Sequence, residues 1–307
     1  MTLVIAHRGA SVEAPENTVP AIRRAWKREA DGVEIDIHLT RDNRLAVIHD
    51  GDTGRVAKVA LPVATSTLAQ LQSIDVGRWK KKRYVGRRVP SLDQALAFVD
   101  REKWAFLELK SGPRIAPFFV RELARLGRFD SRLMICSFKL ETLAAVRDEI
   151  VRQGIDFPVE NQKLPTNAPR ATAQRWGRGG LGWICGLAEV EALRHNSERE
   201  TMFWRAESAG CSWLSLHHSR AIEPSFVSDA SKHGFRIACW TVDKEQEATR
   251  LARVGVHAVI TNDPKKTGPY VKAVRKPDEQ AEIQVSNQAK TKSQHTRAAL
   301  PAWASGE

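Results

Sequence analysis

The sequence predicts a TIM-type (β/α)8 barrel, an α/β fold, on three observations. Short apolar runs alternate with helical segments along most of the chain, which is the pattern of a parallel sheet covered by helices. Eight such units fit within about 265 residues, close to the usual length of a barrel, and the chain has 307 residues. Ionisable residues directly follow several of the apolar runs, as they do at the carboxyl ends of barrel strands.

The predicted strands are short apolar runs, several of them bounded by turn residues. They are expected at 3–6, 32–38, 45–48, 104–109, 133–137, 213–216, 236–240 and 258–261. The pattern is weaker between 156 and 207, where 157–160 and 181–185 are the candidate strands. The glycine-rich stretch 177–182 has no clear assignment.

The predicted helices repeat apolar residues at three- and four-residue spacing. They are expected at 17–30, 65–74, 91–100, 115–126, 140–151, 225–233 and 244–254. Asn17 or Thr18 can cap the first helix, and Pro20 then falls in the first turn, where proline is tolerated. Apart from 65–74, the segment 51–90 is polar and irregular.

Composition excludes several classes of protein. Hydrophobic residues make up 42% of the chain, so wholesale disorder is excluded. The four cysteines form no C-x-x-C pair, and their scatter through strand-like segments favours buried free thiols over disulfides. Met1 runs straight into the first strand, which predicts no secretory signal. No run approaches the roughly 18 apolar residues that span a bilayer, and a cytoplasmic location is expected.

The chain is basic, with a formal net charge of +12. Its densest basic patch is Lys80-Lys81-Lys82-Arg83, with Arg78, Arg87 and Arg88 nearby. This patch is either a solvated surface or a field that gathers anionic substrates or touches phosphate head groups. No nucleic-acid module is recognisable, so no nucleic-acid partner is expected. Membrane contact is allowed but not required. Residues 271–307 are predicted to be a mostly disordered polar tail, which holds six Lys or Arg and four Asp or Glu.

Four residues near the start of the chain point to phosphate-ester chemistry. His7 and His49 each follow an apolar run, and histidine supplies acid and base near neutral pH. Glu34 and Asp36 form an E-x-D pair on one strand, so both carboxylates face the same side and suit a hard divalent cation. Glu108 ends another strand and adds a carboxylate at the same barrel mouth. Acid, base and cation together suggest hydrolysis of a phosphate ester.

An ordered set of motifs resembles the glycerophosphodiester phosphodiesterase family. The matching segments are AHRG at 6–9, APENT at 14–18, VEID at 33–36, LTRD at 39–42, VIHD at 47–50, DVG at 75–77, VPSL at 89–92, LELK at 107–110, SF at 137–138, CWTV at 239–242, and 255–264. Their order and spacing hold over roughly residues 3 to 265. A single H-R-G would be weak evidence, whereas the ordered set is specific.

The resemblance implies a barrel over residues 1–270, with a small insertion after the second strand at about 52–90, and a divalent cation, Mg²⁺ or Ca²⁺. It also implies roles for individual residues: Glu34, Asp36 and Glu108 as metal ligands, His7 and His49 as the catalytic acid–base pair, and Arg8, Lys110 and Trp240 as substrate contacts. Arg8 and Lys110 would contact the phosphate, and Trp240 would wall the pocket. The order in which the two histidines act stays open.

The expected function is metal-dependent hydrolysis of glycerophosphodiesters, small-molecule substrates of lipid and glycerol metabolism, to glycerol 3-phosphate and an alcohol. One alternative is a phospholipase D-like hydrolysis of lysophospholipids, which an extended apolar groove would favour. Another is a non-catalytic barrel that binds an anionic ligand or a membrane surface.

Five further positions carry expectations. The family usually has Asn where this chain has Asp243, and T-D-x-P where it has Thr261-Asn262-Asp263-Pro264. Both departures are expected to lie away from the metal ligands. His38 continues the Glu34/Asp36 face but is expected not to be a ligand, and His217 and His218 are expected to be surface or loop residues.

Overall fold

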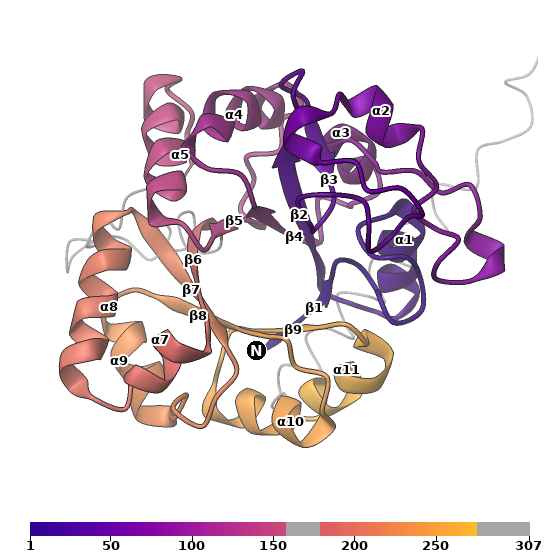
Figure 1. Cartoon of the computed structure of the whole chain (residues 1–307). Coiled ribbons are helices and arrows are strands. Elements are labelled where there is room, and N and C mark those ends of the chain that lie inside the picture. Colours follow the sequence, from indigo (N-terminus) through magenta and orange to yellow (C-terminus); the bar gives the residue numbers. More distant parts are fainter. Residues whose placement is uncertain (158–178, 275–307) are drawn as a thin grey trace, which may run out of the picture.

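The computed structural model of the chain describes residues 1–157 and 179–274. Its parallel strands form a closed eight-stranded barrel. They are β1 Leu3–His7, β2 Gly32–Leu39, β4 Trp104–Leu109, β5 Leu133–Ser137, β6 Gly180–Cys185, β7 Cys211–His217, β8 Arg236–Trp240 and β9 Ala258–Thr261. The ring closes because β1 pairs with both β2 and β9. Figure 1 looks along the barrel axis, with the strands around the centre and the helices outside them. The predicted barrel is confirmed.

The helices cover the outside of this ring (Figure 1). They are α1 Val19–Lys27, α2 Leu68–Gln72, α3 Leu92–Leu96, α4 Ala116–Arg125, α5 Leu140–Arg152, α7 Leu187–Ala192, α8 Asn196–Ser208, α9 Pro224–Lys232, α10 Glu245–Val254 and α11 Pro264–Lys272. Thr18 is the N-cap residue of α1, although its hydroxyl donates to the carbonyl of Pro15 rather than capping the helix. Pro20 lies in the first turn of α1, as predicted.

The ninth strand, β3 Leu45–Val47, lies outside the ring. It runs antiparallel to the end of β2, where it pairs with Ile37–Leu39, and its Ala46 also forms an isolated antiparallel bridge with Ser91. A tight turn that places Asn43 at φ 57° joins the two strands, and antiparallel strands need only such a short connection. The predicted strand at 45–48 is therefore real, but it begins the insertion and adds nothing to the barrel wall.

The structure differs from the sequence prediction in the weakly patterned regions. The helix expected at 65–74 is broken into a 3₁₀ turn, Val63–Thr65, and the short α2. Phe157 belongs to no strand, and the rest of the strand expected at 157–160 lies outside the described residues. The glycine-rich stretch ends inside β6. A Cβ on Gly182 would lie 3.0 Å from the sulfur of Met134, so close packing explains the glycine that obscured this strand. Helices α7, α8 and α11 were not predicted, and α11 runs two residues past the expected boundary at 270.

The barrel interior changes from apolar to ionic along the strand direction. Trp104, Phe106 and Trp213 pack edge to face inside it, with ring centroids 5.5 to 5.9 Å apart. Trp104, Phe106 and Glu108 occupy every second position of β4. Their side chains therefore share one face of the strand. The aromatic side chains thus fill the floor, and Glu108 faces the mouth above them.

A small apolar core joins the insertion at about 52–90 to the β3 segment that precedes it. It consists of Ala46, Ile48, Val56, Val63, Leu68, Leu71, Val76 and Val89. Because burial of apolar surface stabilises a folded segment, this core explains how a mostly polar stretch keeps a defined position beside the barrel.

All four cysteines are buried free thiols, as predicted: Cys136, Cys185, Cys211 and Cys239. Burial raises their pKa values, for example that of Cys211 to about 12, so they are poor nucleophiles. Within residues 1–157 and 179–274, none of the helices has the length and apolar character needed to cross a bilayer.

Deleting residues 276–307 is expected to leave kcat/KM on a soluble diester unchanged. The composition of this segment lacks the apolar periodicity needed for docking onto the barrel, and the barrel strands are complete by Thr261. Steady-state kinetics of the truncated and full chains check this. A large loss of kcat/KM would mean that the segment covers the barrel mouth.

Candidate active site

Three buried carboxylates meet at the barrel mouth. Glu34 and Asp36 lie two residues apart on β2, so their side chains share one face. Glu108 lies on β4, directly across from Asp36 in the strand register. One oxygen from each of the three lies within 4.8 Å of the others. The side chains are nearly inaccessible, with exposures of 4% for Glu34, 0% for Asp36 and 8% for Glu108. The predicted ligand set is thus brought together as expected.

This concentration of negative charge disturbs the ionisation of the cluster. Burial and the charge of Asp36 raise the pKa of Glu34 well above its usual value. The same two causes raise the pKa of Glu108 to about 7. Burial also opposes ionisation of Asp36, but Lys110 and Arg8 outweigh it and lower the pKa of that carboxyl. The three carboxylates therefore need compensating positive charge to be ionised together.

The donor set fits a hard divalent cation. Glu34 Oε1 and Asp36 Oδ1 are buried and accept no hydrogen bond in the described part of the chain, although buried polar atoms are usually satisfied. Three carboxylate oxygens without sulfur ligands are the chemistry that Mg²⁺ and Ca²⁺ prefer. A cation between them would satisfy the orphan oxygens and replace the protons that the raised pKa values of Glu34 and Glu108 imply.

His7, the last residue of β1, stands opposite Glu34 in the strand register. Its Nε2 lies 3.8 Å from Glu34 Oε2, and its Nδ1 lies 2.7 Å from Asn262 Oδ1. Burial and the neighbouring Arg8 charge lower the pKa of His7 to about 4. His7 is consequently a neutral ring whose Nε2 faces the carboxylate cluster.

Arg8 continues from β1 in a left-handed conformation, with φ 57°, which is uncommon outside glycine and suggests a functional constraint. Its backbone N–H donates to Glu34 (3.0 Å), and its Nε lies 3.4 Å from Asp36 Oδ2. Gly9 follows at φ 78°, and a Cβ there would lie 2.6 Å from the backbone of Ala21. Only glycine fits this approach of the turn to α1.

His49 reaches the mouth from the segment after β3. Its Nδ1 lies 2.6 Å from Asp50 Oδ1, and the ring lies close enough to His7 and Asp36 to contribute to the lowered pKa of each. Asp50 in turn accepts from Arg55 Nε at 2.6 Å. The second predicted histidine is thus held by a carboxylate, which is itself held by the insertion.

The loop between β1 and α1 supplies two further residues to the site, of which Asn17 is predicted from the sequence only as a possible helix cap. Asn17 Nδ2 donates to Asp36 Oδ2 at 2.7 Å, and the Asp36 backbone N–H donates back to Asn17 Oδ1 at 3.1 Å. Glu16 Oε1 accepts from Arg8 Nη1 at 2.9 Å and from Arg55 Nη2 at 2.7 Å. Both lie in the APENT motif, so the signal was present in the sequence, but the partners of these side chains were not.

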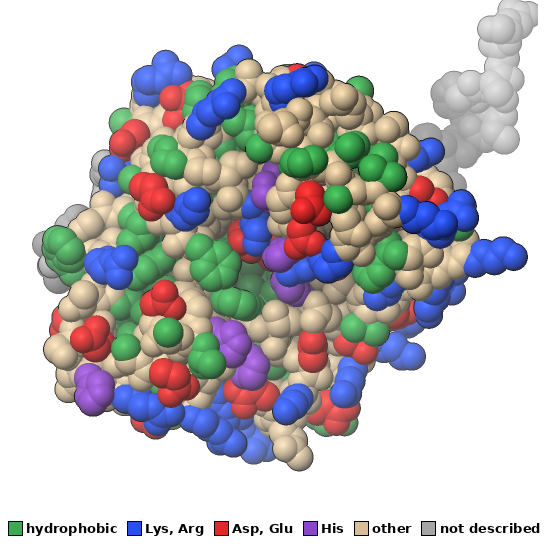
Figure 2. Space-filling view, in the orientation of Figure 1, with side chains coloured by type: hydrophobic (Ala, Val, Ile, Leu, Met, Phe, Trp, Pro, Cys, Tyr) green, Lys and Arg blue, Asp and Glu red, His purple; other side chains and the backbone are tan. Residues whose placement is uncertain are grey.

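Lys110 and Trp240 also lie at the mouth. Lys110 Nζ is 2.7 Å from Glu108 Oε1 and 3.5 Å from Asp36 Oδ1. Trp240 ends β8 and packs edge to face with Phe138, the centroids 5.6 Å apart. Phe138 is 46% exposed and lies 5.8 Å from Lys110 Nζ. In Figure 2, charged and histidine side chains surround a hollow at this end, with hydrophobic side chains on one side of it.

The structure also places the other three histidines discussed above, which are His38, His217 and His218. His38 Nε2 lies 3.0 Å from the carbonyl oxygen of His49, outside the carboxylate cluster. It therefore supports the backbone beside a candidate catalytic residue. His217 is the last residue of β7, not a loop residue, and packs against Trp240 with centroids 5.4 Å apart. His218 follows the strand and is stacked on His217.

Asp243 and Asn262 form no hydrogen bond to Glu34, Asp36 or Glu108 among the described residues, but Asn262 is only one residue removed from this cluster. This residue contacts His7 Nδ1, and His7 lies against Glu34. Residues 7 and 262 are far apart in sequence and meet only because β1 and β9 are neighbours in the closed barrel.

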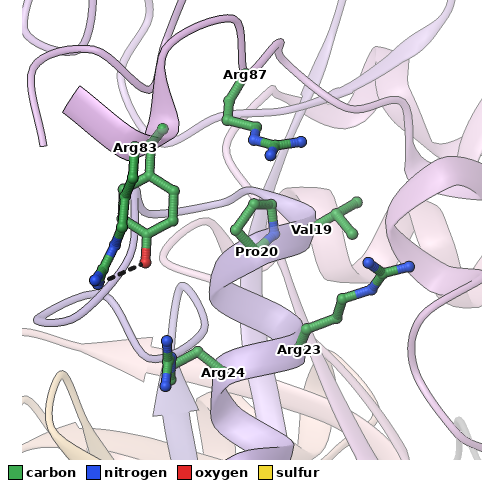
Figure 3. Close-up of a pocket in the computed structure, with 7 residues that line it drawn as sticks. Val19, Pro20, Arg23, Arg24, Arg83 and Arg87 are labelled. Atoms are coloured by element: carbon green, nitrogen blue, oxygen red, sulfur yellow. Dashed lines mark hydrogen bonds between the residues drawn. The ribbon is translucent and has the colours of Figure 1, made fainter. Parts of the chain in front are cut away.

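A basic cavity lies apart from the carboxylates. It measures about 310 Å³ and is lined by Val19, Pro20, Arg23, Arg24, Arg83, Tyr84 and Arg87. Figure 3 shows the four arginines around the start of α1, with Arg83 and Arg87 contributed by the insertion. Part of the basic patch of the sequence thus faces α1 rather than the metal ligands.

The fold and the site define a class: a parallel α/β barrel with a buried carboxylate cluster and two histidines at its mouth. Comparison with known proteins identifies the family within that class. The model of the glycerophosphoryl diester phosphodiesterase family matches residues 7–266. The chain belongs to this family.

Individual relatives support the same family assignment. A glycerophosphodiester phosphodiesterase of Caldanaerobacter subterraneus is 31% identical over 268 residues, which cover 86% of this chain and 95% of the relative. A putative glycerophosphodiester phosphodiesterase of Bacillus subtilis is 28% identical, covering 85% of this chain and 94% of that one. Among solved structures, an Oleispira antarctica phosphodiesterase in complex with the product sn-glycerol-3-phosphate has a TM-score of 0.67 at 23% identity, covering 89% of this chain and 97% of that one. The structural likeness supports the fold.

Proposed function

We propose that this chain hydrolyses glycerophosphodiesters to glycerol 3-phosphate and an alcohol, using one divalent cation and the two histidines. A single observation carries the proposal. In a member of this family, three buried carboxylates share one centre, and two histidines and two cationic side chains surround it. The two full-length relatives described above carry the same activity in their names, and the product complex of the Oleispira enzyme supports a small-molecule substrate.

Glu34, Asp36 and Glu108 would hold the cation, Mg²⁺ or Ca²⁺. Bound there, it would act as a Lewis acid that offsets the phosphodiester charge and favours the more negative transition state. Arg8 and Lys110 lie against the same carboxylates and can turn their remaining donors to the phosphate oxygens. Arginine and lysine donors to phosphate form strong charge-assisted hydrogen bonds.

The partners of the histidines distinguish their roles. The amide oxygen of Asn262 accepts from His7 Nδ1, so neutral His7 keeps a lone pair on Nε2 and can take a proton from the attacking water. The Asp50 carboxylate accepts from His49 Nδ1 and stabilises a protonated ring, which can donate to the leaving oxygen. One P–O bond forms to water and one breaks to the alcohol. The water proton goes to His7, and the alcohol receives a proton from His49.

The test of this function is release of glycerol 3-phosphate from glycerophosphocholine in the presence of Mg²⁺ or Ca²⁺. A coupled glycerol 3-phosphate dehydrogenase assay measures the product. The proposal expects turnover with either cation or both. A complete absence of turnover on glycerophosphocholine, glycerophosphoethanolamine and glycerophosphoglycerol would favour the non-catalytic binding barrel instead.

A second candidate function is hydrolysis of lysophospholipids at the same site. Phe138 directly follows β5, and Leu187 begins α7 two residues after the end of β6; they are 46% and 50% exposed. Exposed apolar side chains beside a polar centre can receive an acyl chain. Comparing kcat/KM for lysophosphatidylcholine and glycerophosphocholine separates the two functions. A Phe138→Ala change that lowers only the lipid rate would support the second.

The basic insertion is expected to speed capture of anionic substrates without altering the chemistry. Residues 271–307 carry six basic and four acidic side chains, so most of the +12 charge belongs to the rest of the chain. Lys80 is close enough to Glu16, beside Arg8, for the Glu16 charge to act on its pKa. Replacing Lys80, Lys81 and Lys82 with glutamine should therefore reduce kcat/KM for net-negative substrates at low salt, because such fields are screened over about 8 Å at physiological salt.

Salt dependence and substrate charge provide the internal controls for this prediction. The loss should shrink as salt rises, kcat should hardly change, and zwitterionic diesters should respond much less. A control triple variant at Lys27, Lys232 and Lys272, in the last turns of α1, α9 and α11, removes equal charge from the opposite end of the barrel. Equal losses for both substrate types at every salt concentration would rule out steering.

A further inference from the structure

Asp243 and Asn262 form a paired hydrogen-bonding unit beside His7. Asp243 follows β8 and Asn262 follows β9. Asn262 Nδ2 donates to Asp243 Oδ2 at 2.7 Å, and the Asn262 backbone N–H donates to Asp243 Oδ1 at 2.8 Å. Thr261 Oγ1 also donates to Asp243 Oδ1, at 3.0 Å. Three donors from two consecutive residues therefore hold this carboxylate, which suits an ionised, acceptor-only group.

This arrangement fixes which way the Asn262 amide points. Its nitrogen must face the acceptor Asp243, so its oxygen faces His7 Nδ1, 2.7 Å away. Ser11 Oγ donates to the same oxygen at 3.0 Å. A flipped amide would put its oxygen, an acceptor, against the Asp243 carboxylate, whereas the Ser11 hydroxyl can donate or accept and tolerates either orientation. The amide oxygen can only accept, so His7 Nδ1 must carry the hydrogen, and Nε2 is left as the acceptor that faces Glu34.

Asp243 and Asn262 are also two positions at which the sequence departs from the motifs of the resemblance described above, and these two departures are reciprocal. The pattern has an amide where this chain has Asp243 and a carboxylate where it has Asn262. Exchanging both side chains keeps one carboxylate and one amide in contact, whereas exchanging either alone does not.

We propose that Asp243 and Asn262 are positioning residues that act as one unit, with Asp243 orienting the Asn262 amide and Asn262 fixing the tautomer and direction of the His7 ring. The expected loss of kcat rests on the proposed function, whereas the expected change in the His7 tautomer does not. Asp243→Asn leaves two amides in contact and frees Asn262 to flip its nitrogen toward His7. Asn262→Asp brings two carboxylates to the 2.7 Å contact, where both cannot stay ionised. The double exchange restores the pairing, because the new carboxylate at position 262 accepts from His7 and also from the new amide at position 243.

The kinetic test compares both single variants with the double exchange. Each single variant is expected to lower kcat for glycerophosphocholine by roughly 10- to 100-fold, the usual cost of losing a partner that orients a functional histidine, with KM nearly unchanged. The double exchange should recover to within a few fold of wild type. In a His7→Ala background, none of the three should lower kcat further. Asp263→Asn, an adjacent carboxylate that caps α11 through Lys266, is the matched control and should retain wild-type kcat.

The structural test does not require turnover. Long-range ¹H–¹⁵N NMR correlations of the His7 ring, assigned by their loss in His7→Ala, should show the Nδ1–H tautomer in wild type and in the double exchange. Asp243→Asn should lose it partly or wholly. An unchanged tautomer in that variant overturns the proposal. The proposal is also overturned if the double exchange has a kcat no higher than that of the worse single variant while its Tm is unchanged. A correct tautomer pattern in an inactive wild-type protein would contradict the proposed function alone.

Discussion

Removal of divalent cations is expected to abolish release of glycerol 3-phosphate, and adding Mg²⁺ or Ca²⁺ should restore it. Glu34, Asp36 and Glu108 concentrate three carboxylates in a buried centre, where Glu34 and Glu108 have raised pKa values. Without a cation, the centre holds protons or unpaired charge and cannot offset the charge of a phosphodiester. Activity in excess chelator, followed by metal titration, measures the effect.

Binding provides a second readout of the same prediction. Calorimetry should detect one cation per chain, and Glu108→Gln should weaken its affinity strongly, because the neutral amide is a poorer ligand than a carboxylate. Glu122→Gln is the matched control, since Glu122 lies on α4 and pairs with the exposed Arg125. Full activity in excess chelator would refute the metal centre.

His7→Ala and His49→Ala are each expected to lower kcat by roughly 10²–10⁴-fold, the usual scale for losing a general acid or base. Both proteins should stay folded, because the two side chains lie at the barrel mouth and outside the apolar core. The double variant should lose less than the product of the single losses if the residues act as a unit. His195→Ala, at the exposed N-cap of α8, is the control. Near-normal kcat in either single variant would show that its role is misassigned.

Leaving-group dependence separates the acid from the base. A p-nitrophenyl diester has a leaving group that needs little protonation, so it should partly rescue His49→Ala while leaving His7→Ala impaired. The assignment follows from the Asp50 and Asn262 partners of the two rings. Rescue of His7→Ala instead would reverse the roles of the two histidines.

The sequence predicts the barrel and the carboxylate cluster at its mouth because both follow from local rules. Strand and helix periodicity is visible in short windows, and two-residue alternation places Glu34 and Asp36 on one face. Glu108 joins them because parallel strands end at one mouth. Prediction was weakest at β6, where 181–185 was correctly named as a candidate strand although Gly182, which permits close packing against Met134, interrupts the apolar pattern. It failed in the insertion, whose helical turns are very short.

The contacts that orient the histidines could not be predicted, because they join distant segments. Asn262 meets His7 through closure of the barrel, and Arg55 links Asp50 to Glu16 across the mouth. Local periodicity carries no information about such pairs. Motif positions indicated that Glu16 and Asn17 were special, but only the three-dimensional structure assigns their partners.

The most direct measurement of the central claim is hydrolysis of glycerophosphocholine in ¹⁸O-labelled water with the metal-loaded protein, followed by ³¹P NMR and mass spectrometry of the products. The account predicts glycerol 3-phosphate carrying one ¹⁸O atom on phosphorus, together with unlabelled choline, and no such product from Glu108→Gln. Phosphocholine and glycerol as products, label in choline, or equal turnover by Glu108→Gln would contradict it.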